Sequence, residues 1–304
     1  MSAIRLPVRR IIAAVDFEDH WENMVGHAAA FATRHDADLH LVHVVRSPGW
    51  LLRKVLDEKG LAAHLDDLLS TARQRIEAHA ATLEGIRVHV RVDVGKPSVA
   101  VRAALEELNA DLLVLGVAAE TRGTVALLGG TAGRLLRMSP IPVYISGPYA
   151  PGPIGEVLVP TGLGPGGRAA IEVAAGLVSD SGTVCALHMV RLPSVMRSYS
   201  GDVMALRRKL AAKAQEELDA HVASAEVPSG STVESMLVTD LEVVPADATI
   251  VRVAREREAQ TICLAVGGRS LAQGLIMGGV TERVIRTLPC ALLALPDAWV
   301  AKGR

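Results

Sequence analysis

Glycines and one hydroxyl residue follow an apolar run in the first half of the chain. Residues 112–116, LLVLG, have the pattern of a fully buried strand, and Gly129-Gly130-Thr131 opens a helix after a longer loop. Glycine lets a backbone approach an anion closely. The free N–H groups at a helix start then face that anion, with the helix dipole assisting. The stretch from Gly116 to Thr131 is therefore predicted to bind a phosphate.

A carboxylate stands at the end of an earlier strand. Asp16 directly follows Ile11–Val15, a short run rich in β-branched residues. A carboxylate at this sheet edge can accept hydrogen bonds from a ribose or from the edge of an adenine. Asp16 and the glycine loop together predict a mononucleotide site with a nucleoside pole and a phosphate pole. Two structural alternatives stay open: Asp16 as the N-cap of a helix near His20, and the glycine pair as a tight turn.

The elements that must position these residues occur twice. Residues 129–143, GGTAGRLLRMSPIPV, are similar to residues 278–292, GGVTERVIRTLPCAL, and residues 10–16 are similar to residues 156–162. Such a repeat indicates two copies of one domain. The segment Gly147–Gly155 is rich in proline and glycine, as linkers are. We predict domains at 1–147 and 156–304, with a linker at 148–155.

Hydrophobic periodicity alternates between strand and helix types in each half. The predicted strands are Ile11–Val15, Leu39–Val45, Val88–Val94, Leu112–Gly116 and Val143–Ser146, then Val157–Thr161, Val184–Val190, Val233–Val238, Ile262–Val266 and Ala291–Leu295. Helices are predicted between them, one of them capped by Ser98. This alternation predicts, in each half, a five-stranded, doubly wound parallel α/β sheet of the flavodoxin or Rossmann type. Ligands of such sheets bind at the carboxyl ends of the strands.

The Asp after the first strand, the glycine loop after the fourth, and residues 135–145, LLRMSPIPVYI, resemble the universal stress protein family. The resemblance covers both halves and so implies a tandem member. It implies a stress-response binding or regulatory module rather than an enzyme. Many members bind ATP through a glycine, two residues, a glycine, nine residues, a glycine and then Ser or Thr, whereas others lack this motif and bind no nucleotide.

The first half departs from that motif at two positions. Gly116 and Gly129 match, but Ala119 replaces the second glycine and Gly130 replaces the hydroxyl residue, with Thr131 one position later. The resemblance implies a site for ATP or another adenine nucleotide. Its residues would be Asp16, Gly116, Gly129, Gly130 and Thr131, with Val44 and Gly95 near the other strand ends that line the nucleoside pocket.

The second half departs further. Gly268 and Gly278 match, but Ala265 and Gly279 replace the first glycine and the hydroxyl residue, and Gly162 stands in place of the Asp. Arg269 could meet a phosphate. Gly268, Arg269, Gly278 and Gly279 are therefore the weaker candidate site.

Two other functions compete with a nucleotide sensor. One is a nucleotide-free interaction scaffold whose glycine loops have degenerated. The other is NADP binding through Gly162–Gly167, GLGPGG, which has the GxGxxG spacing between a strand and a helix. The following strand ends in Arg191, which could meet a 2′-phosphate, in place of the acidic residue of that fingerprint. The equivalent loop of the first half, Asp16–Asp19, has no such glycines, and Pro165 stiffens the second, which favours a flexible glycine turn.

Composition argues against several other classes. A net charge of −1 and 3% aromatic residues disfavour a nucleic acid or an anionic membrane as partner. Three distant cysteines form no disulfide framework, and the histidine spacings predict no metal site. No apolar run approaches the roughly 20 residues of a membrane span, so a cytoplasmic location is expected.

The last strand of each half suggests how the halves assemble. Val143–Ser146 and Ala291–Leu295 are short and apolar, and an unpaired edge of this kind recruits a partner strand. The linker keeps the halves at a high effective concentration. We predict an intrachain pseudo-dimer in which these two strands lie adjacent and antiparallel; a homodimer of chains is compatible with it.

Overall fold

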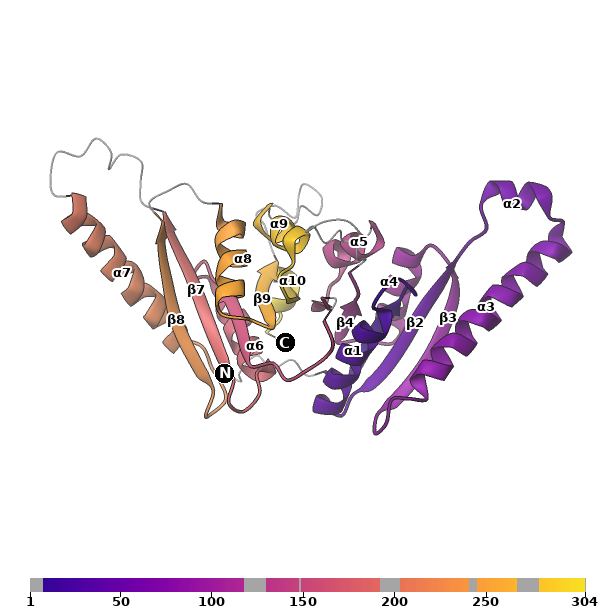
Figure 1. Ribbon diagram of the computed structural model, residues 1–304, viewed down its shortest axis with the longest axis horizontal. Helices are drawn as coiled ribbons and strands as arrows, with labels where there is room; N and C mark the ends of the chain where they lie inside the picture. The colour runs from indigo at the N-terminus through magenta and orange to yellow at the C-terminus, as the bar shows by residue number, and fades with distance from the viewer. Residues whose placement is uncertain are drawn as a thin grey trace. The chain divides into compact units, whose positions relative to one another are not determined.

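A computed structural model describes residues 8–117, 130–147, 149–191, 203–240, 245–266 and 279–303 (Figure 1). Four predicted site residues, Gly129, Gly268, Arg269 and Gly278, lie outside these ranges. The chain divides into two compact units, with the boundary between Gly152 and Pro153. They are called the N-terminal and the C-terminal unit below.

The N-terminal unit contains five strands in the order β3-β2-β1-β4-β5. All four strand pairings are parallel. The strands are β1 (Arg10–Val15), β2 (Asp38–Arg46), β3 (Arg87–Gly95), β4 (Leu112–Leu115) and β5 (Val143–Ile145). The helices are α1 (Trp21–His35), α2 (Trp50–Val55), α3 (Glu58–Ala80), α4 (Pro97–Glu107) and α5 (Gly130–Met138).

The C-terminal unit repeats this topology, with the strand order β10-β9-β6-β7-β8. Its pairings are also parallel. The strands are β6 (Glu156–Pro160), β7 (Thr183–Arg191), β8 (Thr232–Asp240), β9 (Thr261–Val266) and β10 (Ala291–Pro296). The helices are α6 (Pro165–Leu177), α7 (Val203–Ala223), α8 (Ala246–Glu256), α9 (Gly279–Thr287) and α10 (Asp297–Val300). The predicted doubly wound parallel α/β fold is confirmed.

The central strands form the core of each unit. Every residue of β4 is buried, as are Ile11 and Ile12 of β1 and Val157–Val159 of β6. Strands that are apolar along their whole length are covered by helices on both faces. Their carboxyl ends are left as the edge where loops can build a site.

Local predictions were wrong at three places. α2 and α10 were not predicted, because they span only six and four residues, too few for a helical period to show. Ser98 is not a helix cap. Lys96 occupies the N-cap of α4 and Pro97 begins the helix, where its fixed φ and missing N–H suit the first turn. Ser98 is instead buried inside that turn.

The three cysteines all belong to the C-terminal unit. Cys185, Cys263 and Cys290 are buried and form no disulfide. Burial raises the pKa of each thiol above its usual value, because an apolar surrounding disfavours the thiolate. Over the described ranges, no helix could cross a bilayer.

Candidate functional site

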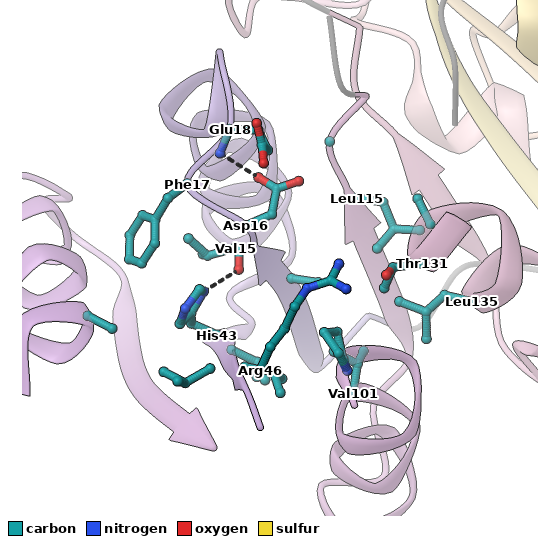
Figure 2. Close-up of a pocket in the computed structure, with 18 of the residues that line it drawn as sticks. Val15, Asp16, Phe17, Glu18, His43, Arg46, Val101, Leu115, Thr131 and Leu135 are labelled. Carbon is teal, nitrogen blue, oxygen red and sulfur yellow. Dashed lines mark hydrogen bonds between the residues drawn. The ribbon is translucent and has the colours of Figure 1, made fainter. Parts of the chain in front are cut away.

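A cavity of about 630 Å³ lies at the carboxyl ends of β1, β2 and β4 in the N-terminal unit. Helices α3, α4 and α5 supply the rest of its wall. Figure 2 shows Phe17 and His43 on one side, Thr131 and Leu135 on the other, and the Arg46 side chain between them. Of the predicted site residues, the cavity brings together Asp16, Val44, Gly116, Gly130 and Thr131.

The carboxylate of Asp16 is held by the turn that follows β1. Its Oδ1 accepts a hydrogen bond of 3.1 Å from the backbone N–H of Glu18, and Phe17 between them has a left-handed φ of 61°. An Asp side chain commonly stabilises a turn through its own backbone in this way. The N-cap of α1 is His20, so the alternative reading of Asp16 as that cap was wrong. The Asp16 carboxylate faces the cavity (Figure 2).

Gly130 and Thr131 bring the start of α5 to the same cavity. Gly130 is the first residue of α5, and the backbone N–H groups of a first helical turn have no partner within the helix. A Cβ added at Gly130 would have no atom of the described residues within 4 Å. Space therefore remains where the family motif has a hydroxyl side chain.

Gly95 is not brought to the site. It ends β3 opposite Arg46 in the β2–β3 register, and it is absent from the residues that line the cavity. The strand end was predicted correctly, but β3 is the outermost strand beyond β2, so its last residue lies past the cavity wall. Arg46 of β2 occupies that side instead.

An aromatic and cationic group beside Asp16 was not identified from the sequence. The Phe17 ring lies 4.5 Å from the His43 ring and 5.4 Å from the Trp21 ring, between centroids. The guanidinium carbon of Arg75 lies 4.4 Å from the Phe17 ring centroid, a cation–π distance. Phe17, His43 and Arg75 all line the cavity. The sequence did contain a signal for this group: Phe17 and Trp21 follow Asp16 closely in a chain with only 3% aromatic residues.

His43 is a neutral hydrogen-bonding group in this cavity. Its Nδ1 lies 2.8 Å from the carbonyl oxygen of Val15, and a carbonyl can only accept, so Nδ1 carries the proton. Burial lowers the pKa of His43, which favours the uncharged ring. Its Nε2 is then an acceptor.

The corresponding loop of the C-terminal unit lacks the carboxylate. Gly162 stands there, and within the described part of the chain no atom lies within 4 Å of its Cβ position. The hydroxyl of Thr161 lies 3.2 Å from Nε2 of His221 and accepts a hydrogen bond of 3.1 Å from the backbone of Leu163. Gly279 begins α9; the other candidates of this half lie outside the described residues.

Two of the four glycines of the GLGPGG segment, Gly166 and Gly167, have a packing explanation. A Cβ added at Gly166 would lie 2.7 Å from the Cβ of Ala265 on β9, and one added at Gly167 would lie 2.0 Å from the Thr161 hydroxyl. Both distances are far below normal contact, so only glycine lets α6 approach the sheet this closely. Gly166 and Gly167 thus belong to a closely packed helix start, whereas no described atom lies within 4 Å of a Cβ added at Gly162 or Gly164.

The model of the universal stress protein family matches residues 7–146 and 154–296. The chain belongs to the universal stress protein family. The two matches make it a tandem member, as its repeats and motifs predicted.

Solved structures agree with this assignment at the level of the fold. A universal stress protein from Archaeoglobus fulgidus DSM 4304 is 19% identical, with a TM-score of 0.61, and the alignment covers 94% of this chain and 98% of that one. A functionally unknown protein from Pseudomonas aeruginosa PAO1 is 18% identical, with a TM-score of 0.64 and coverages of 98% and 96%. A search of curated proteins gives no significant match.

Proposed function

We propose that the N-terminal unit of this universal stress protein binds an adenine nucleotide, with ATP the first candidate. The chain would then act as a nucleotide-responsive regulatory module without catalysis. One observation carries the proposal: a single cavity gathers Asp16, Gly116, Gly130 and Thr131 from three separate parts of the unit.

The chemistry of the cavity suits the two ends of such a ligand. Asp16 and the neutral His43 offer acceptors for ribose hydroxyls or an adenine amine, and Phe17 offers an aromatic face nearby. The N–H groups at the start of α5 and the Thr131 hydroxyl offer donors to a phosphate. A cavity of about 630 Å³ is within the ordinary size range for a small-molecule site.

Calorimetric titration of the purified chain with ATP, ADP, AMP, adenosine and NADP tests the proposal. Mass spectrometry of ligand retained through gel filtration supplies an independent measurement. We expect adenine nucleotides to bind with one site per chain. Binding of NADP alone would contradict the proposal and favour the GLGPGG loop as the site. The absence of any binding would favour a nucleotide-free interaction scaffold.

A further inference from the structure

We infer that Arg46 sets the charge specificity of the N-terminal cavity. It supplies a phosphate contact in place of the hydroxyl that the family motif has at position 130, so the site selects nucleotides with several phosphates over nucleosides. This inference rests on the proposed function and adds the residue that determines its specificity for the phosphate chain.

The position of Arg46 follows from the strand that carries it. Arg46 is the last residue of β2, and the β2–β3 register pairs it with Gly95, which has no side chain to engage it. Its side chain lines the cavity. Figure 2 shows the guanidinium extending from the end of β2 toward the space between Asp16 and Thr131. The group therefore faces both ends of the site.

The guanidinium of Arg46 is available, unlike that of other arginines on this sheet. Arg87 pairs with Asp36 and Asp38, and Arg91 pairs with Asp93 and Glu107. By contrast, Arg46 makes no ion pair with any residue that the structure describes.

Arg75, the other arginine of the cavity wall, is already held against aromatic rings. Its guanidinium carbon lies 4.4 Å from the Phe17 centroid and 5.5 Å from the Trp21 centroid. A guanidinium stacked in this way is positioned beside the nucleoside pole. Arg46 is left as the cation that can turn toward a phosphate.

The charge of Arg46 determines whether the described wall of the cavity is neutral or negative. Among the described lining residues, the carboxylates of Asp16 and Glu18 are balanced by the guanidiniums of Arg46 and Arg75. Without Arg46 the described wall carries an excess of negative charge, which repels a phosphate chain. With it, a planar fork of N–H donors is present, the geometry that fits phosphate oxygens in pairs.

The test compares Arg46→Gln with the wild type across ATP, ADP, AMP and adenosine. Glutamine keeps much of the side-chain length but removes the charge. We expect ATP affinity to fall roughly tenfold to a hundredfold, the loss typical of one hydrogen bond to a charged group, while adenosine affinity changes by less than about twofold. Arg102→Gln is the matched control, because Arg102 pairs with Glu106 and does not line the cavity.

Arg46→Lys is the second variant; it retains charge without the fork and is expected to keep part of the preference for ATP. Thermal unfolding of all variants checks that each is folded. Equal losses for ATP and adenosine, or an unchanged ATP affinity in Arg46→Gln, would overturn this inference and leave the proposed function standing. A wild-type chain that binds none of the four ligands overturns both.

Discussion

The loops after β1 and β6 have the same backbone but different side-chain chemistry. Phe17 and Leu163 occupy equivalent places, with left-handed φ values of 61° and 60°. Two residues before each, the backbone carbonyl accepts a 2.8 Å hydrogen bond from Nδ1 of a histidine on the second strand, His43 or His188. The loop conformation is thus retained in the copy that has no carboxylate, so it belongs to the fold rather than to ligand binding.

The helix starts beside these loops show where the two copies diverge. In the N-terminal unit the ring of His79 packs at 4.8 Å against Trp21. In the C-terminal unit Gly167 occupies the matching place, and His221 reaches the hydroxyl of Thr161 at 3.2 Å. Where the N-terminal unit has a tryptophan packed on a histidine, the C-terminal unit has a glycine, and a histidine contacts the loop itself. The loop therefore presents a carboxylate to a cavity in the N-terminal unit, whereas in the C-terminal unit the equivalent loop forms a contact between a hydroxyl and an imidazole.

The largest effect should come from adding one methyl group at Gly167. Its Cβ would lie 2.0 Å from the Thr161 hydroxyl oxygen, so α6 must shift or the contact with His221 must break. We expect Gly167→Ala to lower the free energy of unfolding by about 3 kcal/mol, the upper part of the range for overpacking. Chemical denaturation measures this loss.

Gly162→Ala is the matched control for that experiment, since its Cβ position is open and its φ is not left-handed. Its effect should stay within about 0.5 kcal/mol. Equal destabilisation by both variants would show that α6 is not packed as closely as described. Thr161→Ala combined with Gly167→Ala should recover part of the loss.

Removal of the Asp16 carboxylate tests whether the N-terminal unit is the one that binds the nucleotide. Asp16→Ala should weaken adenine-nucleotide binding by about 1.5–3 kcal/mol, as expected for a charged hydrogen-bond partner. Gly162→Ala, at the equivalent place in the C-terminal unit, should leave that affinity unchanged. Calorimetric titration with ATP distinguishes them; similar losses in both variants would contradict the assignment of the site to the N-terminal unit.

A smaller gain is expected from Gly130→Ser. No described atom lies within 4 Å of the Cβ position, so the serine hydroxyl can be placed at the start of α5 without displacing a described neighbour. It should tighten ATP by about 0.5–1.5 kcal/mol, the net value of one hydrogen bond, and leave adenosine nearly unchanged. Parallel titrations measure the difference. If ATP and adenosine respond alike, position 130 does not face a phosphate.

The smallest effect concerns pH. Burial lowers the pKa of four histidines of the N-terminal unit and one of the C-terminal unit: His27, His35, His40 and His43, and His221. The folded state prefers these rings neutral. The contribution of these neutral rings to the free energy of unfolding is therefore fully present above the pKa of an unfolded histidine, about 6.5. It is lost as the pH falls below that value. The N-terminal unit should thus lose more stability than the C-terminal unit between pH 7 and pH 5.

Calorimetric unfolding at several pH values measures that difference. His40→Gln should reduce the pH dependence of the N-terminal unit, because His40 is stacked on His89 with centroids 4.7 Å apart and charging both rings is unfavourable. A pH response that is equal in the two units would contradict the prediction.

The order of the elements could be predicted because central strands such as β4 are continuous apolar runs, and the repeat provided a second example of every strand. The candidate site could be predicted only in part. Asp16 and Thr131 follow from their places after β1 and at the start of α5. Whether an arginine at a strand end faces solvent or a cavity depends on the helices around it, so Arg46 and Arg75 could not be assigned from the sequence. The packing roles of Gly166 and Gly167 likewise depend on neighbours distant in the chain.

All three cysteines lie buried in one unit, with thiols whose pKa is raised. Thiol reagents attack the thiolate and must reach it, so each cysteine reacts only when its surroundings open. The reaction rate of these native cysteines therefore measures how often the surrounding structure opens. With an aromatic disulfide that releases a coloured thiolate on reaction, the rate of colour release measures the opening of the C-terminal unit, and the N-terminal unit does not contribute to it.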